Sequence, residues 1–279
     1  MNDKEKRKQR LTWWRDAKIG MFVHWGCYSV FGRGEQIVSR DLMPLSEYEP
    51  IAEEFRPEPD WADRLAEQAV NMGAKYAVLT TRHHDGYCLF DTKTHDFNAV
   101  QTGPGRDLIS EYVEAFRKAG LRIGFYYSIL NWRNRAFWDP LKYSDELPGI
   151  VDEIHTQVEE LMSNYGKIDV LWYDVSAVPG GGTPGSFGYQ SNRLETSSAE
   201  FYRSEELNAR VRELQPEILI NNRSGVPEDF GTPEQRVDPE DDPDRAWETC
   251  MTLNSAPNWG YRKHSMADKP AGEVLYNMI

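Results

Sequence analysis

Cysteine is scarce in this sequence, which has three in 279 residues, Cys27, Cys88 and Cys250, with no C-x-x-C pair. This spacing argues against a disulfide framework or a zinc knuckle, so we expect reduced thiols. No apolar run reaches the length of a membrane span. The start, MNDKEKRKQR, lacks the apolar segment of a signal peptide. We therefore expect a cytoplasmic protein, although a chain that had lost its leader would look the same.

Basic residues are also in short supply. The sequence has 32 Lys and Arg against 45 Asp and Glu, a formal net charge of −13. Nucleic acids and anionic membranes both favour a basic protein face, so we expect neither as a partner. Aromatic residues, by contrast, make up 12% of the chain. An abundance of Trp and Tyr suits carbohydrate, because sugar C–H groups pack on aromatic rings while the hydroxyls bind polar groups.

Short apolar runs alternate with longer helical patterns along most of the chain. The runs predict strands at 18–25, 75–82, 121–128, 169–174 and 217–223, with a weaker one at 250–255. The helical patterns lie between them, at 60–73, 107–120, 146–166 and 198–216. This alternation predicts an α/β protein with a parallel sheet covered by helices, either a doubly wound sheet or a (β/α)8-type TIM barrel.

Two features favour the barrel, as a single domain over 1–279. No G-x-G-x-x-G follows a predicted strand, so the usual nucleotide-binding signature of a doubly wound sheet is missing. Barrel enzymes collect their catalytic groups at the carboxyl ends of strands. The predicted strands end in polar residues of this kind: His24, Arg82, His83, Ser128, Asp174 and Arg223. The glycine-rich segment 179–192 is interpreted as an active-site loop, because the strand–helix rhythm resumes after it.

One carboxylate stands at the end of a predicted buried strand. In DVLWYD (169–174), Trp172 and Asp174 point to the same side, because side chains alternate along a strand. Burying an acid there is costly without a purpose. Catalysis and a structural role, as a helix N-cap or in a salt bridge, are both open. A second carboxylate is expected from an acid-rich stretch whose spacing selects no member: Glu228, Asp229, Glu234, Asp238, Glu240, Asp241, Asp242, Asp244 and Glu248.

Three histidines also lie at predicted strand ends. His24 follows the first strand, and His83 and His84 follow the second. Together with Asp174 they form a possible zinc ligand set. Against this, metal-dependent barrel hydrolases usually place H-x-H on the first strand, and two adjacent histidines fit poorly around one ion on an extended chain. The other two interpretations are that the histidines hydrogen-bond to a substrate, or that they are ordinary surface residues.

Several motifs occur in the same order as in one known family. They are AKIGMFVHWGCYSV, GAKYAVLTTRHHDGYCLFDTKTHDFNAV, VLWYD, NNRSGVPEDFGTPEQ and WETCMTLNSAPNWGYR. From about residue 13 to 266 the sequence resembles glycoside hydrolase family 29, the retaining α-L-fucosidases. HWG, HHDG and the Trp-x-Asp strand end make the resemblance specific in combination, since each motif alone is weak.

The resemblance implies an activity and a set of site residues. It implies a catalytic (β/α) barrel that hydrolyses terminal α-linked L-fucose from a fucosylated glycan or glycoside, with retention and without cofactor or metal. The nucleophile falls on Asp174 and the acid/base on Glu234, with Glu248 as the runner-up. A retaining enzyme needs two carboxyls roughly 5–5.5 Å apart, one ionised and one protonated. The fucose-contacting positions fall on His24, Glu35, His83, His84, Tyr126, Trp172, Arg223 and Trp259.

The sequence departs from the family pattern in three places. Gln36 stands where the family usually has a sugar-contacting Trp, and Asn222 replaces the acid of the usual NDR. The sequence stops at EVLYNMI, before a final barrel strand and the family's common C-terminal β-sandwich. We therefore expect a shortened barrel whose open sheet edge favours a homo-oligomer. A catalytically weak or inactive carbohydrate-binding relative is the main alternative, and a zinc-dependent barrel hydrolase the lesser one.

Overall fold

The fold is built around a sheet of five parallel strands in chain order. The computed structural model describes residues 3–174, 177–180, 194–237, 245–255, 258–264 and 268–278. The strands are β1 (Gly20–Val23), β2 (Tyr76–Arg82), β3 (Arg122–Ser128), β4 (Val170–Asp174) and β5 (Leu219–Ile220). Tyr126 of β3 is in register with Thr80 of β2 and with Trp172 of β4. All five strands lie within the predicted ranges.

The parallel arrangement continues past β5. Strands β6 (Phe230–Gly231) and β7 (Ala246–Trp247) form a parallel pair, and a parallel bridge between Asn221 and Phe230 connects them to the main sheet. Side chains from β2, β4, β6 and β7 share one buried cluster, so the sheet curves around a common interior. This interior cluster contains Leu11, Trp14, Tyr76, Val78, Tyr126, Val170, Trp172, Leu219, Phe230, Ala246 and Cys250. The fold is thus of the predicted (β/α)-barrel type, although no pairing joins β7 to β1 within the described residues.

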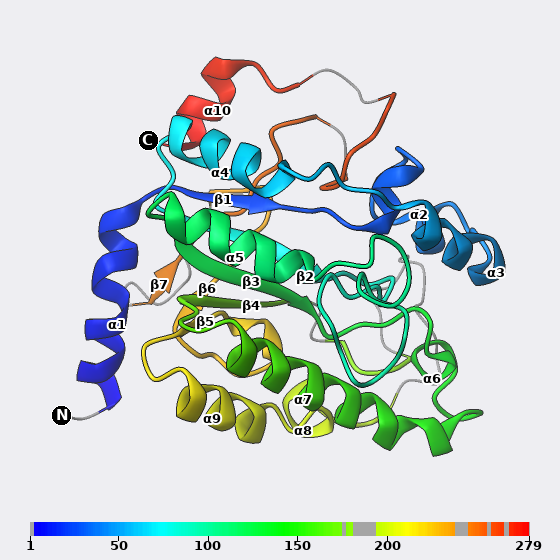
Figure 1. The fold of residues 1–279 in the computed structure, drawn as a ribbon. Helices are drawn as coiled ribbons and strands as arrows, with labels where there is room; N and C mark the ends of the chain where they lie inside the picture. Colours follow the sequence, from blue (N-terminus) through cyan, green and yellow to red (C-terminus); the bar gives the residue numbers. More distant parts are fainter. Residues whose placement is uncertain are drawn as a thin grey trace.

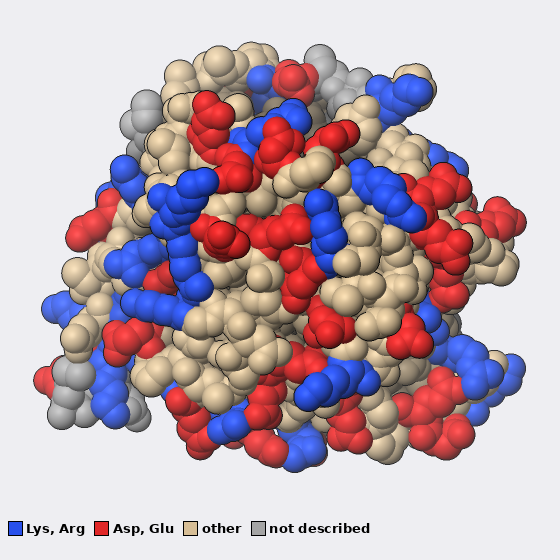
Figure 2. All heavy atoms as spheres, viewed as in Figure 1, with Lys and Arg blue, Asp and Glu red and all other residues tan. Residues whose placement is uncertain are grey.

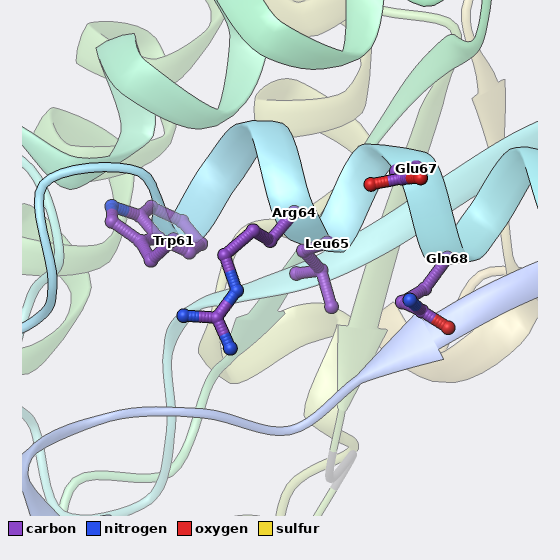
Figure 3. Close-up of a pocket in the computed structure, with 5 residues that line it drawn as sticks. All are labelled: Trp61, Arg64, Leu65, Glu67 and Gln68. Carbon is purple, nitrogen blue, oxygen red and sulfur yellow. The ribbon is translucent and has the colours of Figure 1, made fainter.

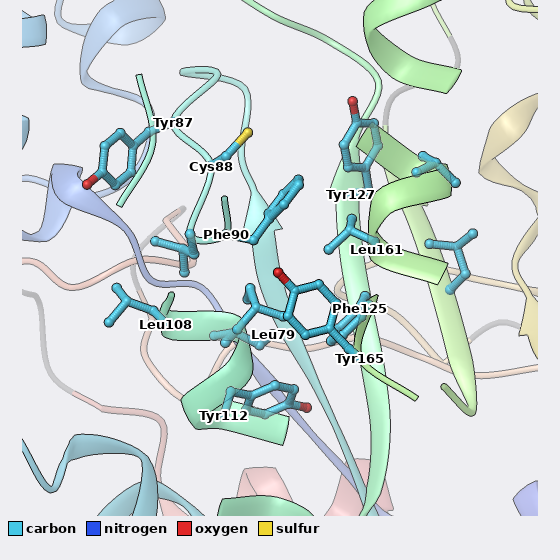
Figure 4. Close-up of a cluster of buried hydrophobic side chains, with 14 of the residues drawn as sticks. Leu79, Tyr87, Cys88, Phe90, Leu108, Tyr112, Phe125, Tyr127, Leu161 and Tyr165 are labelled. Carbon is cyan, nitrogen blue, oxygen red and sulfur yellow. The ribbon is translucent and has the colours of Figure 1, made fainter. Parts of the chain in front are cut away.

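Four longer helices cover the outer face of the sheet (Figure 1): α4 (Trp61–Asn71), α5 (Leu108–Lys118), α7 (Leu147–Asn164) and α9 (Ser204–Leu214). The start of α5 is fixed by Asp107, whose side chain accepts a hydrogen bond from the Ser110 backbone amide at 2.9 Å. Figure 4 shows the packing between helices and sheet, where Tyr112 of α5 and Leu161 of α7 lie near Phe125 of β3. This outer core holds the strands in place and leaves their carboxyl ends free for a site.

Two terminal helices were not predicted. Figure 1 shows α1 (Asp3–Ala17) at the amino-terminal ends of the strands and α10 (Ala271–Met278) beyond α4. Leu11 and Trp14 of α1 enter the interior cluster. Arg7 and Arg10 bind Asp229, the first by its backbone oxygen at 2.7 Å and the second by its carboxylate at 2.8 Å. Helix α1 therefore closes the end of the barrel opposite the predicted site.

The remaining helical elements are single turns or little more. They are η1 (Cys27–Val30), α2 (Ile37–Arg40), α3 (Leu45–Tyr48), η2 (Glu49–Glu54), α6 (Arg135–Trp138), η3 (Ser144–Glu146), α8 (Ser198–Phe201) and η4 (Asn222–Ser224). The predicted helix at 198–216 is interrupted because Arg203 has a left-handed backbone, with φ 53°. The predicted strand at 250–255 was wrong, since Cys250 makes only an isolated bridge to Glu234. Most of the predicted glycine-rich loop, 181–192, lies outside the described residues.

The surface carries both signs of charge. Figure 2 shows Lys and Arg side chains interspersed with Asp and Glu over the face presented in Figure 1. That face therefore offers no continuous basic surface for a polyanion. Among the described helices, none combines the length and the apolar character that a membrane crossing requires.

Candidate active site

The carboxyl ends of β1 to β4 bring most of the predicted site residues together. Ring centroids lie 5.5 Å apart for His24 and His83, 4.1 Å for His83 and His84, and 5.6 Å for His83 and Tyr126. Trp259 stacks on His24 at 5.1 Å, although the two residues are far apart in the sequence. The predicted histidines, Tyr126 and Trp259 thus form one aromatic and polar wall.

Asp174, at the end of β4, has strong donors on both carboxylate oxygens. Arg223 Nη1 donates to Oδ1 at 2.8 Å, and the Tyr126 hydroxyl donates to Oδ2 at 2.6 Å. His84 Nε2 lies 3.6 Å from Oδ2. Burial acts to raise the pKa of Asp174, but the neighbouring His84 and Arg223 and the hydrogen bonds from Tyr126 and Arg223 outweigh it and lower the pKa. Asp174 is therefore ionised at neutral pH, as an attacking carboxylate must be.

Glu234 shares a guanidinium group with Asp174. Arg223 Nη2 donates to Glu234 Oε2 at 3.0 Å, while its Nη1 binds Asp174. The other carboxylate oxygen of Glu234 accepts a bond from Trp259 Nε1 at 3.1 Å. The Glu234 side chain is 42% exposed, against 14% for Asp174. A largely buried and an accessible carboxylate thus contact the same guanidinium group, and two carboxyls are what the chemistry of a retaining glycosidase requires.

Glu35 joins the first strand–helix loop to the segment that carries Trp259. Its Oε2 accepts bonds from the backbone amides of Trp259 at 3.1 Å and Gly260 at 2.7 Å. Gly260 packs closely here, because an added Cβ would lie 3.2 Å from both the Glu35 amide and its carboxylate. Glu35 is 1% exposed and its second oxygen has no partner in the structure. A buried carboxylate oxygen without a donor is unfavourable unless a ligand supplies one.

Further buried polar atoms in this region also lack partners. They are His24 Nδ1, His83 Nδ1 and the hydroxyl of Tyr28, whose ring lies 5.7 Å from that of His83. Tyr28 was not predicted as a site residue, although it lies two residues after HWG. Unpartnered buried donors and acceptors are costly, so a bound molecule rich in hydroxyl groups would satisfy several at once.

The histidines are neutral in this environment. Burial lowers the pKa of His24 to about 3 and the pKa of His83 well below its usual value. Burial also lowers the pKa of His84, although the negative charge of Asp174 opposes the shift. Neutral imidazoles can both donate to and accept from sugar hydroxyls. Within the described residues, no group of three or more His, Cys, Asp or Glu side chains is arranged to hold a metal ion.

Asp85 supports the HHDG turn and was not predicted as a functional residue. The Tyr48 hydroxyl donates to one of its carboxylate oxygens at 2.5 Å, and the Tyr87 amide donates to the other at 3.3 Å. His84 is held in turn by a 2.6 Å contact between its Nδ1 and Ser128 Oγ on β3. The adjacent histidines therefore have defined orientations, which a solvated surface turn would not provide.

Glu248, the alternative acid/base, lies below this region. Its oxygens accept bonds from Trp172 Nε1 at 2.8 Å and from the Tyr76 hydroxyl at 2.6 Å. Burial raises the pKa of Glu248, although these bonds oppose the shift. Tyr76 begins β2, whereas the histidines follow its end. The geometry therefore favours Glu234, which contacts Arg223 together with Asp174.

Two hollows lie outside this cluster. The larger, of about 430 Å³, lies along α4 and is lined by Trp61, Arg64, Leu65, Glu67 and Gln68 (Figure 3), none of which is a predicted site residue. The second, of about 260 Å³, is lined by Val38, Leu42, Met43, Leu45, Trp132 and Trp138. Trp132 also contacts the His84 ring at 5.1 Å, so only the second hollow borders the candidate site.

Comparison with known proteins gives a consistent result. The sequence model of the family described as "Alpha-L-fucosidase" matches residues 1–279. A putative α-L-fucosidase of Caenorhabditis elegans is 27% identical over 94% of this chain and 55% of its own length. The human plasma α-L-fucosidase is 28% identical over 92% of this chain and 57% of its own length. The chain thus spans little more than half the length of these curated relatives.

Solved structures show the same similarity in three dimensions. The α-L-fucosidase isoenzyme 1 of Paenibacillus thiaminolyticus has a TM-score of 0.83 and 37% identity, covering 98% of this chain and 67% of that one. The Lactobacillus casei α-L-fucosidase AlfC, solved with α-L-fucose product, has a TM-score of 0.79 and 30% identity, covering 96% and 86%.

Proposed function

The chain belongs to the α-L-fucosidase family, as its motifs predicted, and on this premise we propose that it hydrolyses terminal α-linked L-fucose from glycans or glycosides. The observation that carries the proposal is the Asp174–Arg223–Glu234 arrangement beside three neutral histidines. The ionised, largely buried Asp174 and the accessible Glu234 both contact Arg223. Nearby buried polar atoms have no hydrogen-bond partner and could bind the hydroxyl groups of a sugar. The similar AlfC protein has been solved with α-L-fucose and, as a variant, with Fuca(1,6)GlcNAc, which supports a fucosyl glycoside as the substrate.

The proposed reaction uses the two carboxylates in two displacements. Asp174 attacks the anomeric carbon of fucose while Glu234 donates a proton to the leaving glycosidic oxygen, so one C–O bond forms as another breaks. Glu234, now ionised, then removes a proton from water, which displaces Asp174 from the anomeric carbon. The configuration at that carbon is inverted twice and so retained. Arg223 and Tyr126 hold Asp174 in place through both steps.

The contacts of the sugar follow from the same geometry. The three imidazoles and the free oxygen of Glu35 are proposed to bind fucose hydroxyls. Trp259, stacked on His24, offers an apolar face for the sugar's methyl group. The hollow bordered by Trp132 lies beside His84 and offers apolar walls to the part of the substrate beyond fucose.

Replacing Asp174 by Ala tests the proposal. The wild type should turn over 4-nitrophenyl α-L-fucoside, and Asp174→Ala should lose turnover by several orders of magnitude. Added azide should restore it and yield a fucosyl azide of inverted configuration, because azide occupies the space of the missing carboxylate. Asp169→Ala is a matched control, since Asp169 lies at the other end of the same strand segment and binds Arg122 at 2.8 Å. It should lose stability and keep turnover.

The outcome also separates the alternatives. A folded wild type that binds fucose without turnover would indicate a carbohydrate-binding relative. Full activity in Asp174→Ala would remove the nucleophile assignment. Stoichiometric zinc in purified protein, with activity lost on chelation, would support a metal-dependent hydrolase.

A further inference from the structure

Trp172 forms a platform beneath the two groups that bind Asp174. The Arg223 guanidinium lies over the Trp172 ring at 4.5 Å, and the Tyr126 ring stacks on it at 5.7 Å with an interplanar angle of 17°. Arg223 and Tyr126 then each donate a hydrogen bond to one oxygen of Asp174. Since both groups rest on the same indole ring, a rotation of that ring would displace both donors together.

The orientation of the indole is set from below by Glu248. The backbone of β4 places the Cβ of Trp172, but the ring can still rotate about its side-chain bonds. A buried indole N–H requires an acceptor, and Glu248 Oε1 supplies it at 2.8 Å. The other Glu248 oxygen is held by the Tyr76 hydroxyl of β2 at 2.6 Å, so the carboxylate is itself fixed at both ends.

We propose that Glu248 is a positioning residue for the glycosidase reaction: it orients Trp172, which in turn places Arg223 and Tyr126 against Asp174. This inference rests on the proposed function and assigns Glu248 a role distinct from proton transfer. Both of its oxygens already accept donors from the barrel wall. Its effect reaches the reacting carboxylate through an aromatic ring and two hydrogen bonds.

A double-mutant cycle with Trp172 tests this chain of contacts. Glu248→Leu should lower kcat/KM for 4-nitrophenyl α-L-fucoside by about 10- to 100-fold, the loss expected when reacting groups are displaced by about an ångström. It should also move the acid limb of the pH profile upward, because Asp174 loses well-placed donors. Trp172→Phe breaks the same hydrogen bond by removing its donor, the indole N–H, instead of its acceptor. The kcat/KM of the double variant should be no lower than that of the less active single variant. Losses that add up in the double variant would refute the proposed chain of contacts.

Two further variants distinguish positioning from general stability. Glu248→Gln keeps a carbonyl oxygen for the indole N–H and should restore the wild-type acid limb. Tyr76→Phe removes the second bond to Glu248 while sparing the bond to Trp172, so it should move that limb less than Glu248→Leu does. An acid limb that stays in place in both Glu248→Leu and Trp172→Phe would overturn the proposal. If Glu248→Leu does not fold, an unmoved limb in Trp172→Phe alone is sufficient to overturn it.

Crystal structures provide a readout that needs no turnover. In Glu248→Leu the indole should be rotated and the Arg223–Asp174 contact lengthened beyond its 2.8 Å. An unmoved indole would refute the positioning role even in an active enzyme. A third outcome is possible, in which the ring is displaced in Glu248→Leu but the wild type does not turn over the fucoside. This outcome would refute the proposed function and would still support the positioning of Asp174 by Glu248.

Discussion

Replacing Tyr126 by Phe should make Asp174, the proposed nucleophile, harder to ionise. Burial raises the pKa of Asp174, and the structure holds it below its usual value only through the charges and hydrogen bonds around it. One of these is the 2.6 Å bond from the Tyr126 hydroxyl. A hydrogen bond to a charged acceptor contributes about 1.5–3 kcal/mol, and about 1.4 kcal/mol corresponds to one pKa unit. The pKa of Asp174 should therefore rise by about 1 to 2 units in Tyr126→Phe.

The assay is the pH dependence of kcat/KM for 4-nitrophenyl α-L-fucoside. The acid limb of this profile reports the ionisation of the free enzyme's essential base. A raised pKa means that Asp174 is protonated, and activity lost, at a higher pH than in the wild type. The acid limb should move upward by the same roughly 1 to 2 pH units, with a smaller loss on the plateau.

The neighbouring residue supplies the control. Tyr127 differs from Tyr126 by one position on β3 and points to the other side of the sheet, where its hydroxyl donates to Gln157 at 2.9 Å. Tyr127→Phe is the same chemical change away from the site and should cost stability without moving the acid limb. An unmoved limb in Tyr126→Phe, or an equal shift in both variants, would show that this hydroxyl does not set the charge of Asp174.

Three other expectations concern stability and proton transfer. Glu153→Ala leaves the fully buried Arg82 without its 2.9 Å ion pair and should lower the free energy of unfolding in urea by about 3–5 kcal/mol. Glu159→Ala removes an exposed ion pair and should lower it by under about 1 kcal/mol. Equal losses in the two variants would contradict this expectation. Because the folded pKa of His24 is about 3, below its ordinary 6.5, the stability it contributes is complete above pH 6.5 and is lost as the pH falls towards 3. Tm should fall between pH 7 and 5 and His24→Asn should flatten the slope, whereas a flat wild-type curve would count against a neutral His24. Glu234→Ala should slow substrates with poor leaving groups far more than 4-nitrophenyl α-L-fucoside, and uniform rates would place the acid elsewhere.

The strands and most helices were predictable because their signals are local. An apolar run bounded by polar residues, as in 75–82, specifies β2 through neighbours in the sequence, and the amphipathic pattern of 107–120 does the same for α5. Short-range signals also explain the errors. Nothing in the apolar period of 198–216 reports the left-handed backbone of Arg203 that divides this segment. Helix α1 was missed because most of its residues are charged and few, such as Leu11 and Trp14, are buried.

The candidate site was predictable in its members but not in its connections. Family motifs pointed to Asp174 and Glu234, yet no sequence pattern shows that a single guanidinium, Arg223, contacts both. The contact of Glu248 with Tyr76 joins residues 172 positions apart. Such contacts depend on how the sheet curves, and curvature follows from the packing of the whole interior rather than from any segment.

Helix α1 is translated well before Asp229, the residue that anchors it. Arg7 and Arg10 meet Asp229 across sequence separations of 222 and 219 residues. During translation Leu11 and Trp14 therefore emerge well before the strands that will enclose them. Folding that depends on such distant contacts is slow. Until the contacts form, the apolar side chains of Leu11 and Trp14 stay exposed and can bind chaperones or other nascent chains. A bulky fusion placed just before α1 should hinder this last docking step more than one placed on an exposed loop.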